Sequence, residues 1–207
     1  MSSTSAPFGL RPAFHPSGLD RAQALANGIQ AVSTSGNVSA GYATNILKGQ
    51  PVKMDTGGYI VVAAAGDAFL GAFAGVEWTD STGRRRVSNY WPANESFQVG
   101  SVVAYFYSDP NIVYEIQSDG TLAQDSIGDE ADLSNTTAGS TTTGLSQCTL
   151  STSLVGANGM AQMRIVDLAP YPGNNWDDDF VIVRAVIAQY QYGQVRVDGV
   201  DYTPIAV

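Results

Sequence analysis

The chain has 207 residues, which suits one domain with a substantial core or two small domains. Its net charge is −9 with only 10 Lys and Arg residues, which argues against a protein that binds nucleic acid or an anionic membrane surface. Charged residues make up 14% of the sequence, against roughly 25% in typical soluble proteins, and so few charges favour loop-rich β structure and burial against partner proteins.

Residues 1–27 differ in composition from the remainder of the chain. This segment is rich in proline, which donates no backbone hydrogen bond and disfavours helix at the preceding residue, so we expect an extended N-terminal arm. Phe8, Leu10 and Phe14 are large and apolar, and their even-numbered separations put them on one side of an extended segment, so they need a surface that covers them. That surface belongs either to the protein's own body or to a neighbouring subunit or shell protein. A short helical stretch is expected over residues 20–26.

Residues 28–207 are expected to form a mainly β body. Short runs of β-branched and aromatic residues, separated by Gly, Pro and Asn or Asp turns, are typical of an antiparallel β-barrel, β-tulip or sandwich, not of βαβ units. The polar stretch 134–144 is a candidate break between two subdomains. The expected strands are 40–46, 52–54, 59–64, 69–78, 84–90, 101–107, 112–117, 147–152, 161–168, 180–187, 189–192, 195–197 and 202–206.

Turn signals suggest how some of these strands are joined. Asp109 with Pro110 predicts a hairpin between strands 101–107 and 112–117, and Asn158 with Gly159 predicts another between strands 147–152 and 161–168. Gly71 and Gly75 lie inside one expected strand and indicate bulges or close backbone approach.

Residues with catalytic or metal-binding chemistry are few. His15, the sole histidine, lies in the N-terminal arm, where a surface or docking role is favoured over a Ser–His–acid site, and one histidine cannot build a histidine-based zinc site. Cys148, the sole cysteine, is expected to be a small strand residue and not a reactive thiol. We therefore expect no enzyme activity, no cofactor, no metal and no small-molecule substrate; a glycosidase pair of carboxylates is not marked out by the sequence.

Two charge runs have two interpretations each. Residues 84–86 are all Arg and form either salt bridges to acidic residues, which we favour, or part of a stacking nucleic-acid site. Residues 177–179 are all Asp, without the spacing of a calcium loop, and are interpreted as a solvated loop or an acidic face for a partner in preference to an ion site.

Several phrases together resemble the decoration (cement) proteins encoded in tailed-phage head gene clusters. They are APFGLRP at 6–12, AGD followed by LGxFxGV within 65–76, DSTGRRRVSNxWP at 80–92, and YSDP leading to YEIQ within 107–117. The resemblance implies a β-barrel or β-tulip-like body, commonly trimeric, that is clamped on the outside of the capsid. It also implies that an N-terminal arm makes the shell contact.

From this resemblance we expect a structural virion protein that binds the outer capsid surface as an oligomer and stabilises the expanded shell. The expected partners are the major capsid protein and further copies of the chain in a homotrimer, and the expected location is the virion surface after synthesis in the host cytoplasm. Neither nucleic acid nor a membrane is an expected partner. The candidate interface residues are Phe8, Leu10, Arg11 and Phe14.

The alternative is a carbohydrate- or receptor-binding β module of a phage fibre or surface structure. Such a module needs exposed aromatic side chains, and the candidates are Tyr171, Trp176, Tyr190 and Tyr192.

Overall fold

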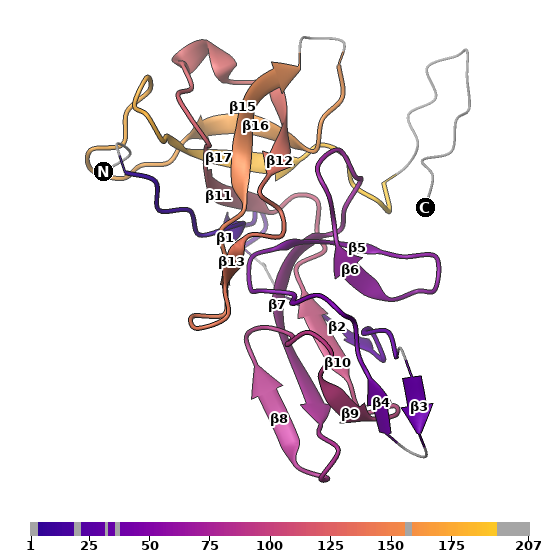
Figure 1. Ribbon diagram of the computed structural model, residues 1–207. Helices are drawn as coiled ribbons and strands as arrows, with labels where there is room; N and C mark the ends of the chain where they lie inside the picture. The colour runs from indigo at the N-terminus through magenta and orange to yellow at the C-terminus, as the bar shows by residue number, and fades with distance from the viewer. Residues whose placement is uncertain (1–3, 19–21, 32, 36–37, 156–158, 194–207) are drawn as a thin grey trace, which may run out of the picture.

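A computed structural model describes residues 4–18, 22–31, 33–35, 38–155 and 159–193 of the chain (Figure 1). This part is mainly β, with antiparallel sheets, and its helical element is the 3-10 turn η1 (Gln124–Ser126). The strands are β1 (Arg11–Phe14), β2 (Gln23–Ala26), β3 (Ser33–Ser35), β4 (Val38–Ala40), β5 (Pro51–Met54), β6 (Ile60–Val62), β7 (Gly71–Thr79), β8 (Arg85–Ser88), β9 (Ser96–Gln98), β10 (Val103–Phe106), β11 (Val113–Gln117), β12 (Glu130–Ser134), β13 (Gly139–Ser140), β14 (Leu145–Ser146), β15 (Thr149–Val155), β16 (Met163–Leu168) and β17 (Ile182–Ile187).

Two larger sheets organise the fold, and each has its own hydrophobic core. The first sheet has the order β1-β11-β17-β16-β12-β15 and forms the upper part of Figure 1. The second has the order β2-β10-β7-β5-β6, with β8 beside β7, and forms the lower part with the small β3-β4-β9 sheet. The first core includes Leu10, Phe69, Ile112, Tyr114, Ile116, Leu133, Leu150 and Ile165, and the second includes Ile46, Ile60, Leu70, Phe73, Trp78, Trp91, Phe97 and Phe106.

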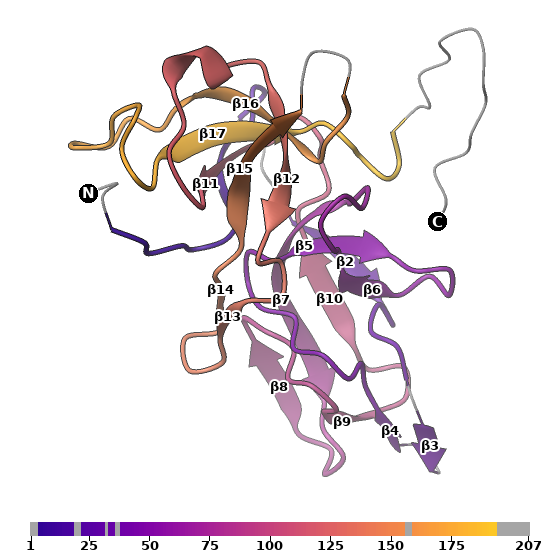
Figure 2. The ribbon, with the colours of Figure 1, turned by 45° about the horizontal axis from the view of Figure 1, so that its top comes forward.

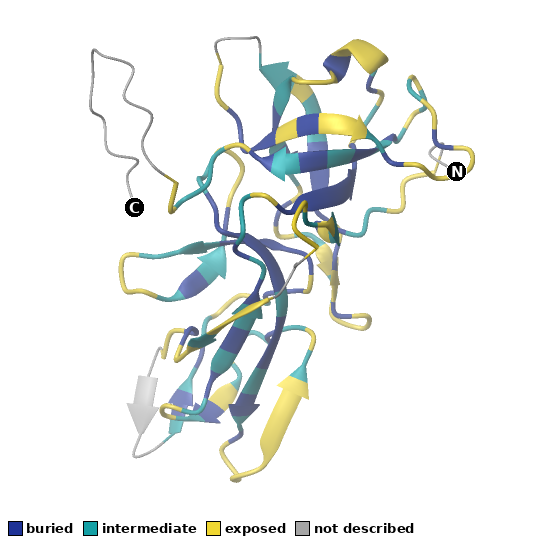
Figure 3. Cartoon of the chain, turned by 180° about the vertical axis from the view of Figure 1, so that it is seen from behind, coloured by how far each residue is buried: buried dark blue, intermediate teal, exposed yellow. Residues whose placement is uncertain are grey.

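The side-chain pattern of each strand follows from what covers its two faces. In β17 buried and half-buried residues alternate, as expected for a strand with one face on the core. In β11 all five residues are buried, because the N-terminal segment covers the outer face: the Ala6 N–H donates to Gln117 Oε1 (2.8 Å) and Gln117 Nε2 donates to the Thr4 carbonyl (3.0 Å). β8 is the opposite case, and Figure 3 shows it exposed beside the buried strand β7.

Neither sheet closes into a barrel, so that part of the expected fold is wrong. The first sheet curls around its core (Figure 2), and its end strand β15 reaches β11 at one isolated bridge, between Leu150 and Ser118, which directly follows β11. Full closure would require the two end strands, β1 and β15, to pair, and the structure does not pair them. The result is a curled, open antiparallel sheet.

Both predicted hairpins are also wrong. β10 and β11 follow each other in sequence but lie in different sheets, so the segment with Asp109 and Pro110 is a crossover between the sheets. β15 and β16 do not pair, because β12 lies between them. A turn signal predicts that the chain reverses its direction. It does not specify which strand pairs with the edge of the strand before the turn.

Most expected strands are found within one to three residues of their predicted ends, and the exceptions are instructive. Gln23–Ala26 is strand β2, not helix, because pairing with β10 outweighs the helix propensity of its alanines. Residues 41–45 are irregular, and residues 189–192 form a turn with one bridge from Tyr190 to Phe69. The strands expected at 195–197 and 202–206 lie outside the described residues.

Gly71 is the place where the chain makes its closest backbone approach. Its φ is +153°, and a Cβ added there would lie 1.7 Å from the Tyr107 carbonyl oxygen. The Tyr107 N–H donates to the Ala72 carbonyl (2.9 Å) on the next residue. The close approach expected for this glycine is therefore confirmed, and it positions the segment after β10 that crosses from one sheet to the other.

Buried glutamines connect the parts of the fold. Gln162 is fully buried; its Oε1 accepts the Leu133 N–H (2.9 Å) and its Nε2 donates to the carbonyls of Ala64 (2.9 Å) and Asp67 (2.7 Å). This side chain therefore joins β12 of the first sheet to the loop after β6 of the second.

The stretch 134–144 lies between β12 and β15, which pair with each other in the first sheet.

Candidate functional site

The predicted interface residues divide between the core and the surface. Leu10 is 1% exposed and belongs to the first core, where its N–H donates to the Gly49 carbonyl (2.8 Å). Arg11 and Phe14 lie in β1 with exposed side chains, and Phe8 is half-buried just before the strand. Leu10 therefore stabilises the fold, whereas Phe8, Arg11 and Phe14 are accessible to a partner.

These three residues surround a buried carboxylate on the neighbouring strand. Glu115 of β11 accepts hydrogen bonds from Arg11 (2.7 Å) and from the Tyr171 hydroxyl, and Arg184 Nε of β17 lies 3.6 Å from its other oxygen. Burial by itself would raise the pKa of Glu115. The hydrogen bonds from Tyr171 and Arg11 and the charges of both arginines outweigh burial, so the pKa lies below its ordinary value.

Aromatic rings hold both guanidinium groups in place. The Arg11 guanidinium carbon lies 4.5 Å from the Phe8 ring centroid and 5.5 Å from that of Tyr171, and the Arg184 carbon lies 5.4 Å from that of Phe14. These distances are those of cation–π contacts. We call this set the β1 surface: Phe8, Arg11, Phe14, Tyr171 and Arg184 around Glu115.

The β1 surface has the composition of a protein–protein contact. Phe14 is 44% exposed and Tyr171 is 38% exposed, and arginine and tyrosine are enriched where binding energy concentrates. Two arginines against one glutamate leave one net positive charge here, on a chain whose net charge is −9. Because the side chains are already held by one another, little conformational entropy is lost when a partner binds.

The backbone of β1 is poorly suited to accept a further strand. β1 is the edge of the first sheet, but Pro12 in its centre has no N–H to donate. The pairing with β11 is also irregular between Pro12 and Phe14. A partner therefore meets the side chains of the β1 surface and not an open strand edge.

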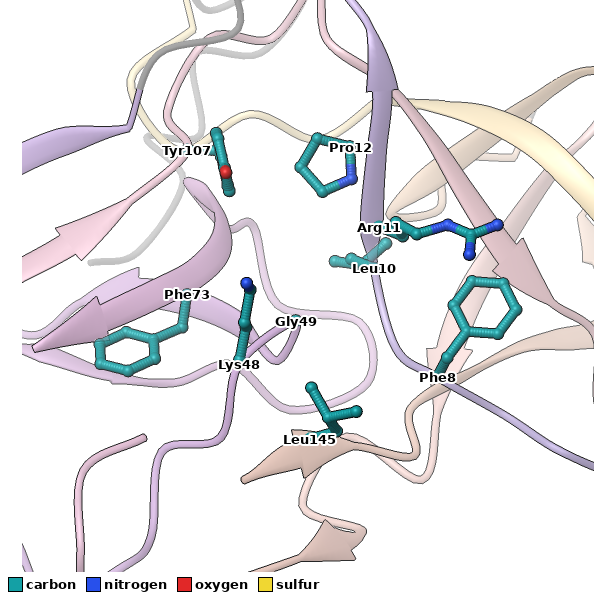
Figure 4. Close-up of a pocket in the computed structure, with 9 residues that line it drawn as sticks. All are labelled: Phe8, Leu10, Arg11, Pro12, Lys48, Gly49, Phe73, Tyr107 and Leu145. Atoms are coloured by element: carbon teal, nitrogen blue, oxygen red, sulfur yellow. The ribbon is translucent and has the colours of Figure 1, made fainter. Parts of the chain in front are cut away.

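A pocket of about 420 Å³ opens next to the β1 surface, on the other side of the N-terminal segment (Figure 4). It lies where β1 meets the loop before β5, strand β7 and the β13–β14 hairpin. We call it the Lys48 pocket. Its lining consists of Phe8, Leu10, Arg11, Pro12, Lys48, Gly49, Phe73, Tyr107 and Leu145.

His15 is not an exposed docking residue. Its side chain is 10% exposed; Nε2 lies 2.9 Å from Asp109 Oδ2, and Nδ1 lies 2.6 Å from Ser17 Oγ. Hydrogen bonds from Asn111 and the contact with His15 hold the pKa of Asp109 below its ordinary value. The order Ser–His–Asp is that of a catalytic triad, but the Ser17 N–H donates to His15 Nδ1 and the Gly18 N–H to the His15 carbonyl. Neither donor is free to hold an oxyanion, so this group connects the segment after β1 to the β10–β11 crossover.

The basic run forms salt bridges within the chain, as favoured from the sequence. Arg85 pairs with Glu77, and Arg86 pairs with Asp80 (2.9 Å). The Thr82 hydroxyl, the Arg84 N–H and Arg86 hold the pKa of Asp80 well below its ordinary value. These contacts fix the β7–β8 turn.

Cys148 is fully buried, but it lies just before β15 and not within a strand as expected. Burial raises the pKa of its thiol to about 12, so the reactive thiolate form is suppressed at neutral pH.

The acidic run directly follows Trp176, one of the candidate sugar-binding aromatics, in the loop before β17. Asp177 and Asp179 are exposed in the loop before β17, and among the described residues no group of three or more His, Cys, Asp or Glu side chains could hold a metal ion. Trp176 packs against the first core, and Tyr190 is in ring contact with Tyr192 (6.2 Å) while its hydroxyl donates to the Ser108 carbonyl. No helix in the described ranges is long and apolar enough to cross a membrane.

Glu115, Tyr171 and Arg184 complete the β1 surface; sequence reasoning missed Glu115 and Arg184, and named Tyr171 only as a candidate of the sugar-binding alternative. Each comes from a different part of the chain, and only the pairing of β1, β11 and β17 brings them together. One signal was available: Glu115 alternates with the apolar Tyr114 and Ile116, and a carboxylate in the centre of a strand requires a partner on its own face.

Comparison with known proteins adds no relative from which a role could be transferred. No protein-family model matches the chain, and no curated protein sequence and no solved structure matches it significantly.

Proposed function

We propose that the chain is a head decoration protein of a tailed phage. It binds the outer capsid surface as a homotrimer and stabilises the expanded shell. The observation that supports this proposal is the β1 surface, in which exposed aromatic rings and two held guanidinium groups surround a buried carboxylate. This surface includes Phe8, Arg11 and Phe14, three of the four residues for which the sequence resemblance implies a shell contact.

The charge distribution suits binding to another protein. The local excess of positive charge on an otherwise acidic chain favours an acidic patch on the partner, and disfavours association through the remaining surface. The proposed partners are the major capsid protein and further copies of this chain, with no nucleic acid, membrane or small-molecule substrate. The proposal includes no enzyme activity.

Stabilisation follows from selective binding. A protein that binds the expanded shell and not its precursor shifts the equilibrium towards the expanded state by mass action. Each protomer of a trimer contributes one weak contact, and linkage within the trimer adds avidity. The proposed location is the outer capsid surface of the virion.

The test is co-sedimentation with empty expanded heads of the encoding phage, after light scattering has measured the mass of the free protein. A trimer has three times the protomer mass of 21.7 kDa, about 65 kDa. Phe14→Asp places a carboxylate on the β1 surface and is expected to reduce head binding at least about tenfold. Val87→Asp is the matched control, because Val87 is 75% exposed on β8 and lies outside that surface.

Two results would contradict the proposal. A wild-type protein that does not sediment with heads excludes the decoration function. Equal head binding by Phe14→Asp and Val87→Asp excludes the β1 surface as the contact.

A carbohydrate- or receptor-binding module of a fibre is the second candidate. The observation in its favour is the Tyr190–Tyr192 ring pair, in which Tyr192 is 59% exposed. A glycan array separates the two proposals: a decoration protein binds no sugar selectively, whereas a receptor-binding module selects one class and loses it on Tyr192→Ala.

A further inference from the structure

The Lys48 pocket combines an apolar lining with polar groups that lack partners. Leu10 and Phe73 are fully buried side chains of its lining, and Phe8, Pro12 and Leu145 are partly exposed around it. A pocket of this composition takes an apolar side chain, because transfer of such a group from water is favourable.

Lys48 is the unusual residue in this lining. Among the described cationic side chains, Lys48 and Arg84 alone have no carboxylate partner, although the chain has nearly twice as many acidic as basic residues. Figure 4 shows the ammonium end of Lys48 pointing into the space between Tyr107 and Leu10, whereas the Arg11 guanidinium is turned away beside Phe8. The Tyr107 hydroxyl makes no hydrogen bond within the described part of the chain.

The root of the Lys48 side chain is held rigidly. Its N–H donates to the Gly144 carbonyl (3.0 Å), its carbonyl accepts from the Ser146 N–H (2.9 Å), and Gly49 beside it is tied to Leu10 and Phe73. The Lys48 side chain therefore starts from a fixed backbone position beside the apolar lining, and its four-carbon stem keeps the ammonium group within reach of a carboxylate bound there.

We propose that the Lys48 pocket binds a peptide segment of a partner protein in which a large apolar side chain stands next to an Asp or Glu. The apolar side chain contacts the partly exposed Phe8, Pro12 and Leu145, above the buried Leu10 and Phe73. The neighbouring carboxylate accepts hydrogen bonds from the Lys48 ammonium group and the Tyr107 hydroxyl. The carboxylate is required because both unpartnered groups donate and the pocket contains no free anion.

This inference rests on the proposed function in one respect, namely that the segment belongs to the shell protein. The specificity of the pocket can be measured without that assumption. Charge complementarity is the argument for this occupant: an acidic segment is attracted by Lys48, and a basic one is repelled.

The first experiment selects peptides from a random heptapeptide library on the folded protein. Wild-type protein is expected to enrich sequences with a large apolar residue next to Asp or Glu. Lys48→Glu is expected to bind these peptides with about tenfold lower affinity. Selection on this variant is expected to enrich peptides with Lys or Arg in place of Asp or Glu. Arg84→Glu is the matched control, because it makes the same change of charge at an exposed cation without a carboxylate partner.

Selection of no peptides, or of peptides whose charge is unchanged by Lys48→Glu, would overturn the inference. A thermal melt of each variant checks that the fold is intact, and Leu145→Asp, at a residue 42% exposed, tests the apolar part of the pocket without charge reversal at Lys48.

The second experiment measures sedimentation of the same variants with expanded heads. Binding by wild type and Arg84→Glu, with loss in Lys48→Glu, supports both proposals. Equal binding by all three overturns the pocket as the shell contact and leaves the proposed function standing. Selective enrichment of acidic peptides without head binding by the wild type overturns the proposed function and leaves the pocket specificity standing.

Discussion

Replacement of Gly71 by Ala tests the central packing of the fold. An added Cβ would lie 1.7 Å from the Tyr107 carbonyl oxygen and 3.0 Å from the Tyr114 hydroxyl. The position of the added Cβ is fixed by the Gly71 backbone, and the Tyr107 oxygen belongs to the backbone of the opposite segment. The clash can therefore be relieved only if β7 and the crossover after β10 move apart. Overpacking of this kind costs about 3 kcal/mol. The φ of +153°, which favours glycine, adds about 1 kcal/mol.

The sum of about 4 kcal/mol is large against a total stability of roughly 5–15 kcal/mol, and for a chain of this size it lowers the melting temperature by about 10 °C. Urea unfolding followed by tryptophan fluorescence is the assay, because Trp78 and Trp91 lie in the second core. Gly58→Ala is the control: its φ is +80°, and nothing lies within 4 Å of an added Cβ. It is expected to cost about 1 kcal/mol. Equal losses in the two variants would refute the packing argument.

Three further predictions concern buried polar groups. The pKa of Glu115 is lowered in the folded protein, so its charge stabilises the fold above the pKa that this carboxyl has in the unfolded chain, and the contribution is lost as the pH falls through the folded pKa. Glu115→Gln should therefore reduce the loss of stability between neutral and acidic pH. An unchanged loss of stability would exclude this role of Glu115. Cys148 should react with a thiol reagent only at the rate of unfolding, and rapid reaction of the native protein would contradict its burial. Gln162→Leu leaves one N–H and two carbonyls without partners, and should lower the free energy of unfolding measured in urea by about 3 kcal/mol. Gln98→Leu, at a half-buried residue of β9, is the control and should lower it by less.

Local patterns in the sequence predicted about half of the strands and one of the tight contacts. Strands such as 112–117 and 180–187 are bounded by turn residues and rich in β-branched or aromatic residues, so short-range physics is sufficient to locate them. Gly71 indicated a close contact because a glycine weakens a strand unless a bulge or a neighbouring backbone needs the space of its missing side chain. The pattern failed at residues 23–26, where an alanine-rich segment becomes a strand because β10 offers a free edge.

The β1 surface could be predicted only in part, for the same physical reason. Phe8, Arg11 and Phe14 stood out in the sequence as apolar and basic residues of an extended segment. Their partners Glu115 and Arg184 are more than a hundred residues away along the chain.

The sequence by itself therefore determined that this protein is mainly β, roughly where about half of its strands lie, and which N-terminal side chains need a covering surface. Only the tertiary structure decided which strands pair, that the first sheet stays open, and that Leu10 is buried while Arg11 and Phe14 remain accessible. The division has a physical reason. Backbone conformation and turn formation depend on neighbouring residues, whereas strand pairing and side-chain burial depend on contacts between distant ones, which compete for the same edges and the same cores.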